Sequence, residues 1–138
     1  MVLQFTLEPG AKMPTRAHKH DVGLDLYATK GGWIFPKCRK TFDTGFHAAI
    51  PPGVAGLLTA KSGMMQKGVT SRGTIDPGYT GSIRAVLINH SWKFVKIESG
   101  QKISQLLLVP IITPELEPVE QLEETDRGAG GFGSTGKF

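Results

Sequence analysis

The sequence turns sharply at Asp76-Pro77-Gly78-Tyr79, within the segment Arg72-Gly-Thr-Ile-Asp76-Pro-Gly-Tyr79-Thr-Gly81-Ser-Ile83. Proline at the first central position presets φ, and glycine at the second supplies the positive φ that a type II turn needs. The flanking stretches 73–75 and 80–89 predict two strands, so we expect a β-hairpin whose tip carries a carboxylate and a phenol ring. An aspartate that begins such a turn is most often structural, and turn chemistry alone explains Asp76.

The composition favours short strands joined by tight turns, because 18 Gly and 9 Pro among 138 residues leave few windows of helical periodicity. This length fits one domain with a modest core. The net charge of +4 suits an anionic partner, although a solvated lysine and arginine surface is the commoner cause. Cys38 is the only cysteine, which excludes an internal disulfide framework and favours a reducing compartment. No signal peptide or membrane span is evident, so we expect a cytoplasmic protein without membrane partners.

Further strands are predicted along most of the chain, at residues 2–7, 21–28, 33–35, 41–50, 54–59, 93–97 and 101–112. The stretch 21–28 alternates, with Leu24 and Leu26 on one side and Asp25 on the other. Asp25 is therefore either the polar face of an edge strand or an oxygen ligand, direct or through water, for a hard cation beside phosphate. Its own strand pattern favours the first alternative.

A short helix is predicted between Lys61 and Gly68, with Ser62 as its N-cap and Gly68 just beyond its end. Free N–H groups at its start, beside a lysine, suit phosphate. The motif is weak by itself, because any capped surface helix has the same pattern.

The last 13 residues, 126–138, predict a flexible tail, because five glycines prevent the segment from ordering by itself. It also contains Arg127, Phe132, Ser134 and Thr135 among repeated backbone N–H groups, which are the parts of an anion cradle with a stacking surface. We therefore predict a body over 1–125 and a tail over 126–138. The tail is not a Walker motif, because Phe138 stands where serine or threonine is required.

Other catalytic patterns are absent from the sequence. There is no Gly-x-Ser-x-Gly elbow, no paired-cysteine zinc spacing and no dinucleotide fingerprint. His18 and His20 are interpreted as solvated loop residues, because no third metal ligand lies near them in the sequence.

Five short motifs together resemble the trimeric dUTPase family, in that family's order and over nearly the whole chain. They are Asp21-Val-Gly-Leu-Asp25-Leu-Tyr-Ala28, Lys61-Ser-Gly63, Gly73-Thr-Ile-Asp76-Pro-Gly-Tyr79-Thr-Gly81, Gly100-Gln-Lys-Ile-Ser-Gln105-Leu, and Arg127-Gly-Ala-Gly-Gly-Phe132-Gly-Ser-Thr-Gly136. The resemblance implies an all-β, jelly-roll-like barrel with one short helix, assembled as a homotrimer with active sites at subunit interfaces. The implied reaction is Mg²⁺-assisted hydrolysis of dUTP to dUMP and pyrophosphate, which limits uracil in DNA and supplies dUMP for thymidylate synthesis.

The resemblance also implies roles for individual residues. Asp76 would deprotonate a water for in-line attack on the α-phosphorus, and Asp25 would contact the Mg²⁺ ion through water. The backbone of 73–79 would bind uracil, Tyr79 would pack on deoxyribose, and the tail would close over the nucleotide with Phe132 stacked on uracil. The implied substrate-binding residues are Lys61, Ser62, Gly63, Gly73, Thr74, Ile75, Tyr79, Gln105, Arg127, Phe132, Gly133, Ser134 and Thr135.

The motifs depart from the family pattern at three positions. Lys61 stands where arginine is usual, which keeps the charge but loses bidentate phosphate geometry. Gly78 replaces a commonly acidic residue, and Thr80 a commonly basic or amide one. These departures affect the expected affinity rather than the reaction class.

Three other functions each match part of the sequence. The sequence resembles dCTP deaminase in its turn, but Val86 occupies the position of that family's general-base glutamate. A barrel that grips single-stranded nucleic acid would need exposed aromatics interleaved with basic residues, of which only Trp33, Phe35 and the stretch 37–40 are evident, so no stable nucleic acid binding is expected. A regulatory protein that uses nucleotide as a signal stays open, because it would keep all five motifs.

Overall fold

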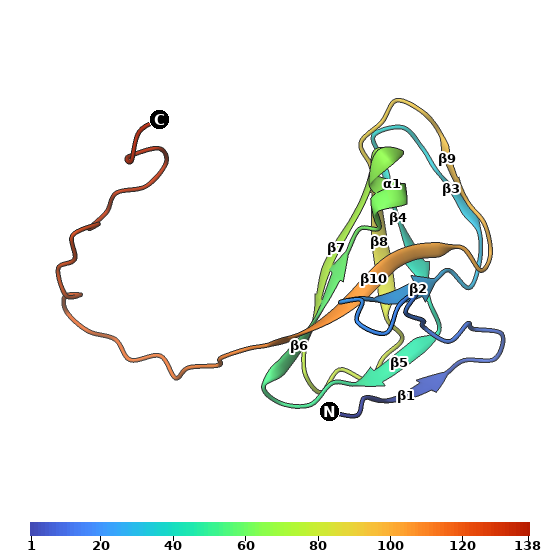
Figure 1. The fold of residues 1–138 in the computed structure, drawn as a ribbon, viewed down its shortest axis with the longest axis horizontal. Coiled ribbons are helices and arrows are strands. Elements are labelled where there is room, and N and C mark those ends of the chain that lie inside the picture. The colour runs from blue at the N-terminus through green and yellow to red at the C-terminus, as the bar shows by residue number, and fades with distance from the viewer.

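The computed structural model describes residues 1–138 and contains ten strands and one short helix (Figure 1). The elements are β1 (Gln4–Leu7), β2 (Leu24–Tyr27), β3 (Gly32–Ile34), β4 (Arg39–Asp43), β5 (Phe46–Ala49), β6 (Val54–Thr59), α1 (Ser62–Gln66), β7 (Val69–Ile75), β8 (Arg84–Asn89), β9 (Val95–Ile97) and β10 (Lys102–Pro110). The predicted all-β class with one short helix is confirmed. None of the helical structure has the length and apolar character needed to cross a membrane.

The strands form one large antiparallel sheet and two small ones. The large sheet has the order β2-β10-β6-β7-β8-β4, and two-stranded sheets pair β1 with β5 and β3 with β9. The large sheet curls around the body, β1 and β5 close one end, and β3 and β9 extend at the other end beside α1 (Figure 1). β6 has the bounds predicted for the strand at 54–59. β10 lies inside the sheet between β2 and β6, where its long apolar run is covered.

Two apolar clusters fill the interior. One lies beneath α1 and the β3–β9 pair and includes Ile34, Met64, Leu87 and Ile97. The other lies toward β1 and β5 and includes Leu26, Phe46, Ile83 and Leu106. Leu26 and Ala28 are fully buried, as the predicted alternation in 21–28 requires, but Val22 on the same side is exposed and Asp25 on the other side is buried. The strand itself spans only Leu24–Tyr27.

The single strand predicted over 41–50 is wrong. β4 ends at Asp43 and β5 begins at Phe46, because Gly45 adopts φ +62° and donates its N–H to Asp43 Oδ1 at 2.9 Å. The hydroxyl of Thr44 donates to the Ile83 carbonyl at 2.6 Å, which fixes the bend. The bend moves the chain from the large sheet, where β4 pairs with β8, to the small sheet, where β5 pairs with β1.

The predicted hairpin around Asp76 is looser than expected. The ladder between β7 and β8 joins only Val69–Ser71 to Leu87–Asn89, and β8 begins at Arg84 rather than at residue 80. Residues 72–75 pair with β6 on their other edge. The segment 76–83 is therefore a wide loop that contains the tight turn, and not a continuous second strand.

Candidate active site

The turn at Asp76 has the predicted type II geometry. Gly78 adopts φ +83°, and the Tyr79 N–H donates to the Asp76 carbonyl at 3.2 Å. The Gly78 N–H donates to the Ile50 carbonyl, also at 3.2 Å. The turn is thus closed internally and attached to the end of the barrel.

The carboxylate of Asp76 is exposed and takes part in no hydrogen bond or ion pair in the structure. A structural aspartate at this position would accept hydrogen bonds from its own turn. Because the turn is closed by backbone groups, the carboxylate is left free for solvent or for a ligand.

Tyr79 is held over the loop that follows the turn. Its hydroxyl donates to the Ser82 carbonyl at 3.1 Å, and the ring stays partly exposed. A Cβ at position 81 would overlap this ring, so Gly81 is required for the tyrosine to lie there. The ring is thus held in a fixed position, three residues beyond Asp76.

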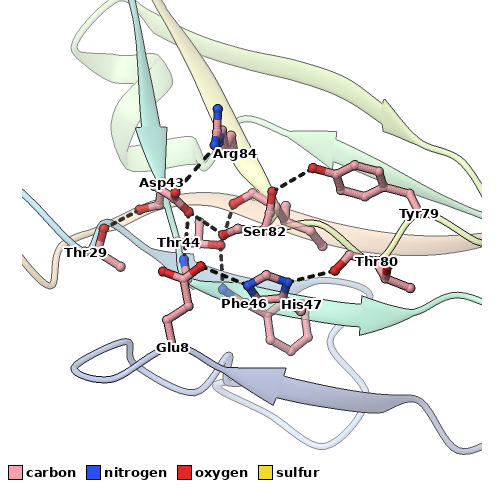
Figure 2. Close-up of polar contacts among 12 residues, drawn as sticks. Glu8, Thr29, Asp43, Thr44, Phe46, His47, Tyr79, Thr80, Ser82 and Arg84 are labelled. Atoms are coloured by element: carbon pink, nitrogen blue, oxygen red, sulfur yellow. Dashed lines mark hydrogen bonds and ion pairs between the residues drawn. The ribbon is translucent and has the colours of Figure 1, made fainter.

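A second polar network supports the loop from the barrel side (Figure 2). Asp43 accepts hydrogen bonds from Ser82 Oγ and from the Gly45 N–H, and Arg84 Nε lies 3.7 Å from its other oxygen. Burial by itself would raise the pKa of Asp43, but these hydrogen bonds and the Arg84 charge outweigh burial and lower it. The loop that carries Tyr79 is therefore tied to the end of β4.

His47 adds a further tie from β5 (Figure 2). Its Nδ1 lies 2.8 Å from the Thr80 carbonyl and its Nε2 lies 3.0 Å from Glu8 Oε1. Both partners are acceptors, so only the imidazolium, which has two N–H groups, satisfies both. The hydrogen bond to Thr80, together with the Glu8 carboxylate, raises the pKa of His47. The sequence showed no sign of His47 or Glu8 as support for the turn.

Asp25 occupies a different environment, on edge strand β2 and almost fully buried. Lys61 Nζ contacts its Oδ1, and Lys102 Nζ lies 3.0 Å from its Oδ2. Burial alone would raise the pKa of Asp25, but hydrogen bonds and charges from the two lysines outweigh it and lower the pKa. Asp25 is thus a fixed negative charge. Sequence reasoning did not identify Lys102, which lies within the fourth motif and gave no separate signal.

Gln105 lies beside Asp25, since the two residues pair across β10 and β2. Its amide nitrogen donates to the Ala60 carbonyl at 3.4 Å, at the start of the Lys61 segment. A Cβ at position 23 would overlap the Gln105 side chain, so Gly23 makes room for it. Residues from the first, second and fourth motifs are thus brought together.

Ser62 and Gly63 are exposed next to this cluster. Ser62 was predicted as the N-cap of α1, and that is wrong: the N-cap is Lys61, without a side-chain hydrogen bond, and Ser62 is the first helical residue. The hydroxyl of Ser62 has no protein partner, and the first N–H groups of a helix have none within the helix. Gly68, with φ +77°, follows the C-cap as predicted.

The tail does not contact the barrel through hydrogen bonds. The last such bond joins the Ile111 N–H to the Gly53 carbonyl at 3.0 Å, and later hydrogen bonds lie within residues 125–136. The chain then runs away from the body (Figure 1). Phe132 is fully exposed, and Arg127, Gly133, Ser134 and Thr135 are exposed as well. These predicted site residues are not brought to either cluster of the same chain.

The turn and the Asp25 cluster lie at opposite ends of β6. Asp76 follows Ile75, which pairs with Gly56, whereas Lys61 lies two residues beyond Thr59, where β6 ends. At about 3.3 Å per residue, the two groups lie roughly 15–20 Å apart along this strand. Within one chain, the free Asp76 carboxylate therefore lies far from the lysines and the Ser62 hydroxyl that suit phosphate.

Comparison with known proteins gives a consistent result. The sequence model described as dUTPase matches residues 10–136. The deoxyuridine 5'-triphosphate nucleotidohydrolase of Clostridium tetani is 41% identical over 135 residues, which cover 95% of this chain and 93% of the relative. The Staphylococcus bacteriophage 80alpha dUTPase with dUPNHPP is 32% identical, covers 99% of both chains and has a TM-score of 0.93. A variant of the dUTPase from phage phi11 of S. aureus, solved for the coordination of a structural Mg(II) ion, is 30% identical, covers 90% of this chain and all of that chain, and has a TM-score of 0.83.

Proposed function

The chain belongs to the dUTPase family, and we propose that it hydrolyses dUTP to dUMP and pyrophosphate with Mg²⁺ as cofactor. The observation that carries this proposal is the Asp76 carboxylate, exposed and unpaired on a turn that the backbone holds rigid. Phosphoryl transfer depends on positioning and charge neutralisation more than on covalent chemistry by the protein. A free carboxylate on a rigid turn, beside a base-binding loop, meets that requirement.

In the reaction, Asp76 accepts a proton from a water molecule whose oxygen attacks the α-phosphorus in line with the leaving group. The bond from the α-phosphorus to the bridging oxygen breaks, and pyrophosphate leaves. Tyr79 packs against deoxyribose, where its anchored ring crowds a ribose 2′-hydroxyl. Anchoring through Ser82 supports this role, because a mobile ring would discriminate poorly.

Uracil is bound by backbone groups of Gly73, Thr74 and Ile75. The ladder with β8 ends at Ser71, so alternate N–H and C=O groups of 72–75 on that edge lack a strand partner. Unpaired backbone groups in fixed positions can imitate the edge of a base, which supports the proposed selectivity for uracil.

Phosphate oxygens are bound by Lys61, Ser62, Gly63 and Gln105. Lys61 precedes Ser62, whose hydroxyl is free, and with Lys102 it places two positive charges around the single carboxylate of Asp25, which supports an anionic ligand at that place. Lysine acts here as a point charge rather than as a bidentate fork. Part of its charge is engaged by Asp25, so phosphate competes with that carboxylate for Lys61.

Mg²⁺ fits this site through water. The ion prefers oxygen ligands, keeps several waters, and is usually held by one or two carboxylates and substrate phosphates. No group of three or more His, Cys, Asp or Glu side chains forms a protein cage in the structure. Asp25 is the carboxylate beside the phosphate-binding residues, and because both its oxygens face lysines we assign it a water-mediated contact. Bound there, the ion would neutralise phosphate charge.

The complete site is assembled from several chains of a homotrimer. Two observations support this: the turn and the phosphate-binding residues of one chain lie at opposite ends of β6, and the tail leaves its own barrel. The segment before the tail also presents exposed apolar side chains with no cover in the chain, at Ile112, Leu116, Val119 and Leu122. The tail then closes over a nucleotide on a neighbouring chain, through Phe132, Arg127, Gly133, Ser134 and Thr135.

Cytoplasmic location is consistent with the single, free Cys38.

The test is a pyrophosphate-release assay on dUTP, dTTP, dCTP and UTP with Mg²⁺. We expect release from dUTP and hardly any from the other three, because the 5-methyl, the cytosine edge and the 2′-hydroxyl are each rejected. Equal turnover of all four nucleotides, or of none, would contradict the proposal. Ammonia release from dCTP would instead indicate a deaminase.

A further inference from the structure

Four aromatic side chains are exposed together on the β3–β9 end of the molecule. Trp33, Phe35, Trp92 and Phe94 keep 52%, 58%, 81% and 61% of their surface exposed. Phe35 and Phe94 contact each other edge to face, with ring centroids 5.2 Å apart. Single exposed aromatics are ordinary, but four on two paired segments gather exposed apolar area at one end of the molecule.

The strand register explains why these rings face outward. Ile34 pairs with Val95, and both are buried in the core. Trp33 pairs with Lys96, and because neighbours along a strand point to opposite faces, these two side chains share the outer face. The Lys96 ammonium lies 6.0 Å from the Trp33 ring centroid, and its other neighbour is Glu98 at 3.9 Å.

A second lysine is fixed over the other tryptophan. Lys37 Nζ lies 4.7 Å from the Trp92 ring centroid and donates to the His90 carbonyl. Lys93 lies between Trp92 and Phe94 and is exposed. We call the seven residues Trp33, Phe35, Lys37, Trp92, Lys93, Phe94 and Lys96 the aromatic–basic surface.

This end of the molecule is rich in positive charge. Segments 32–40 and 91–98 contain five Lys or Arg and one acidic residue, Glu98, whereas the rest of the barrel up to Ile111 has nine basic and five acidic residues. The partner that complements it is an anion long enough to contact several lysines.

We propose that the aromatic–basic surface binds single-stranded nucleic acid. Bases that are not stacked in a duplex can stack on Trp33, Trp92 and the Phe35–Phe94 pair, while the phosphates contact Lys37, Lys93 and Lys96. The sequence led us to expect no stable nucleic acid binding, because only one of the two segments was recognised. The fold brings the second segment, 91–97, beside the first through the β3–β9 pair.

The surface lies away from the proposed catalytic turn. It flanks the end of the β7–β8 ladder where Val69 pairs with Asn89, and Asp76 follows the opposite end of β7 (Figure 1). Nucleic acid bound there would therefore leave the turn accessible, and the binding does not depend on the dUTP reaction.

The experiment measures the fluorescence anisotropy of a labelled oligo(dT) of about 20 nucleotides with the full-length protein. Thymine is chosen because the proposed uracil site excludes its methyl group. We expect binding that weakens with salt, with a slope of log K against log[salt] of roughly −2 to −3.5 for three to five neutralised phosphates. Trp92→Ala and Lys93→Ala should each weaken binding by about 5- to 10-fold or more, whereas Lys19→Ala, an exposed lysine of the loop before Asp21, should not.

Three further measurements decide the assignment. An abasic oligonucleotide of the same length should bind much more weakly, since it cannot stack, and poly-glutamate should not compete at equal charge. Pyrophosphate release and the oligomeric state on sizing should be unchanged in both surface variants. The proposal is overturned if the oligonucleotide does not bind, or if it binds wild type and variants equally. Equal affinity for the abasic strand or for poly-glutamate would also overturn it. Dissociation of the oligomer in the variants would overturn it as well, because the surface would then be a contact between copies of this chain.

Discussion

The fold places the aspartates of the first and third motifs in opposite environments. Asp25 is buried between two lysines at one end of β6, and Asp76 is exposed and unpaired beyond the other end. A carboxylate whose pKa is lowered by two cations is a weak proton acceptor but a stable fixed charge. A free carboxylate on a rigid turn can accept a proton. In the proposed mechanism, this contrast separates charge organisation at the phosphates from proton transfer at the attacking water.

The largest effect is expected from Asp76→Asn. The amide keeps the size of the side chain and cannot accept a proton from water, so kcat for dUTP should fall by about 10²- to 10⁴-fold. KM should change by less than about threefold, because uracil and phosphate contacts are intact. Steady-state kinetics measure both, with Glu98→Gln, an exposed carboxylate elsewhere, as control. An unchanged kcat would remove Asp76 from the role of base.

Deleting residues 127–138 should have the next largest effect. If the tail joins the two ends of the site by closing over the nucleotide, kcat/KM should fall by at least about 10²-fold. The oligomer should persist on sizing, since the apolar segment 112–122 remains. Removing only Lys137 and Phe138 is the matched control and should cost little. A monomer after the longer deletion would show that the tail is a structural strap.

Asp25→Asn should affect binding and stability more than chemistry. Losing the fixed charge should raise KM and the Mg²⁺ concentration needed for half-maximal rate, with kcat reduced less than about tenfold. It leaves Lys61 and Lys102 without their partner, and since both reach solvent, the free energy of unfolding should fall by only about 1–2 kcal/mol. Urea unfolding measures this loss. A kcat as low as that of Asp76→Asn would show that the two aspartates do not have separate roles.

Asp25→Asn also tests how the stability of the protein depends on pH in acid. The pKa of Asp25 is lower in the folded protein than in the unfolded chain, so its stabilising contribution is present above the ordinary pKa of about 4. The contribution is lost as the pH falls from there through the lowered pKa. The stability difference between wild type and Asp25→Asn should therefore shrink below about pH 4. A difference that grows in acid would contradict the assigned pairing.

The smallest effect is expected from His47→Gln, which tests the support of the turn. The raised pKa of His47 means that its contribution is present below the ordinary pKa of about 6.5 and is lost as the pH rises through the raised value. KM of the wild type should rise about twofold across that range, and the variant should lack this step. Glu8→Gln should move the step to lower pH. An identical pH profile in all three proteins would show that the His47–Thr80 contact does not position the turn.

Local chemistry made parts of the fold predictable. The type II turn followed from Pro77 and Gly78, and the bounds of β6 from an apolar run between Gly53 and Lys61. These features depend on residues adjacent in the sequence. The end of α1 was similarly marked by Gly68, whose positive φ a glycine tolerates.

Other features depended on partners that the sequence does not display. The break at Gly45 is stabilised by Asp43 and by Ile83, which lies 38 residues further along the chain. Asp25 was interpreted on its own pattern as a polar residue of an edge strand, and β2 is an edge strand, but Lys61 and Lys102 allow the carboxylate to be buried there. The predicted roles of the tail residues cannot be read from one chain, because the tail makes no hydrogen bond to the barrel from which it starts.

The departure of the chain from its barrel at Ile111 has a consequence for mixtures of defective subunits. If each site combines a turn from one subunit with a tail from another, a subunit with Asp76→Asn and a subunit without its tail carry defects in different places. Neither alone forms a working site. Refolded together, some of their mixed sites contain an intact turn and an intact tail, so two inactive polypeptides should restore activity by complementation.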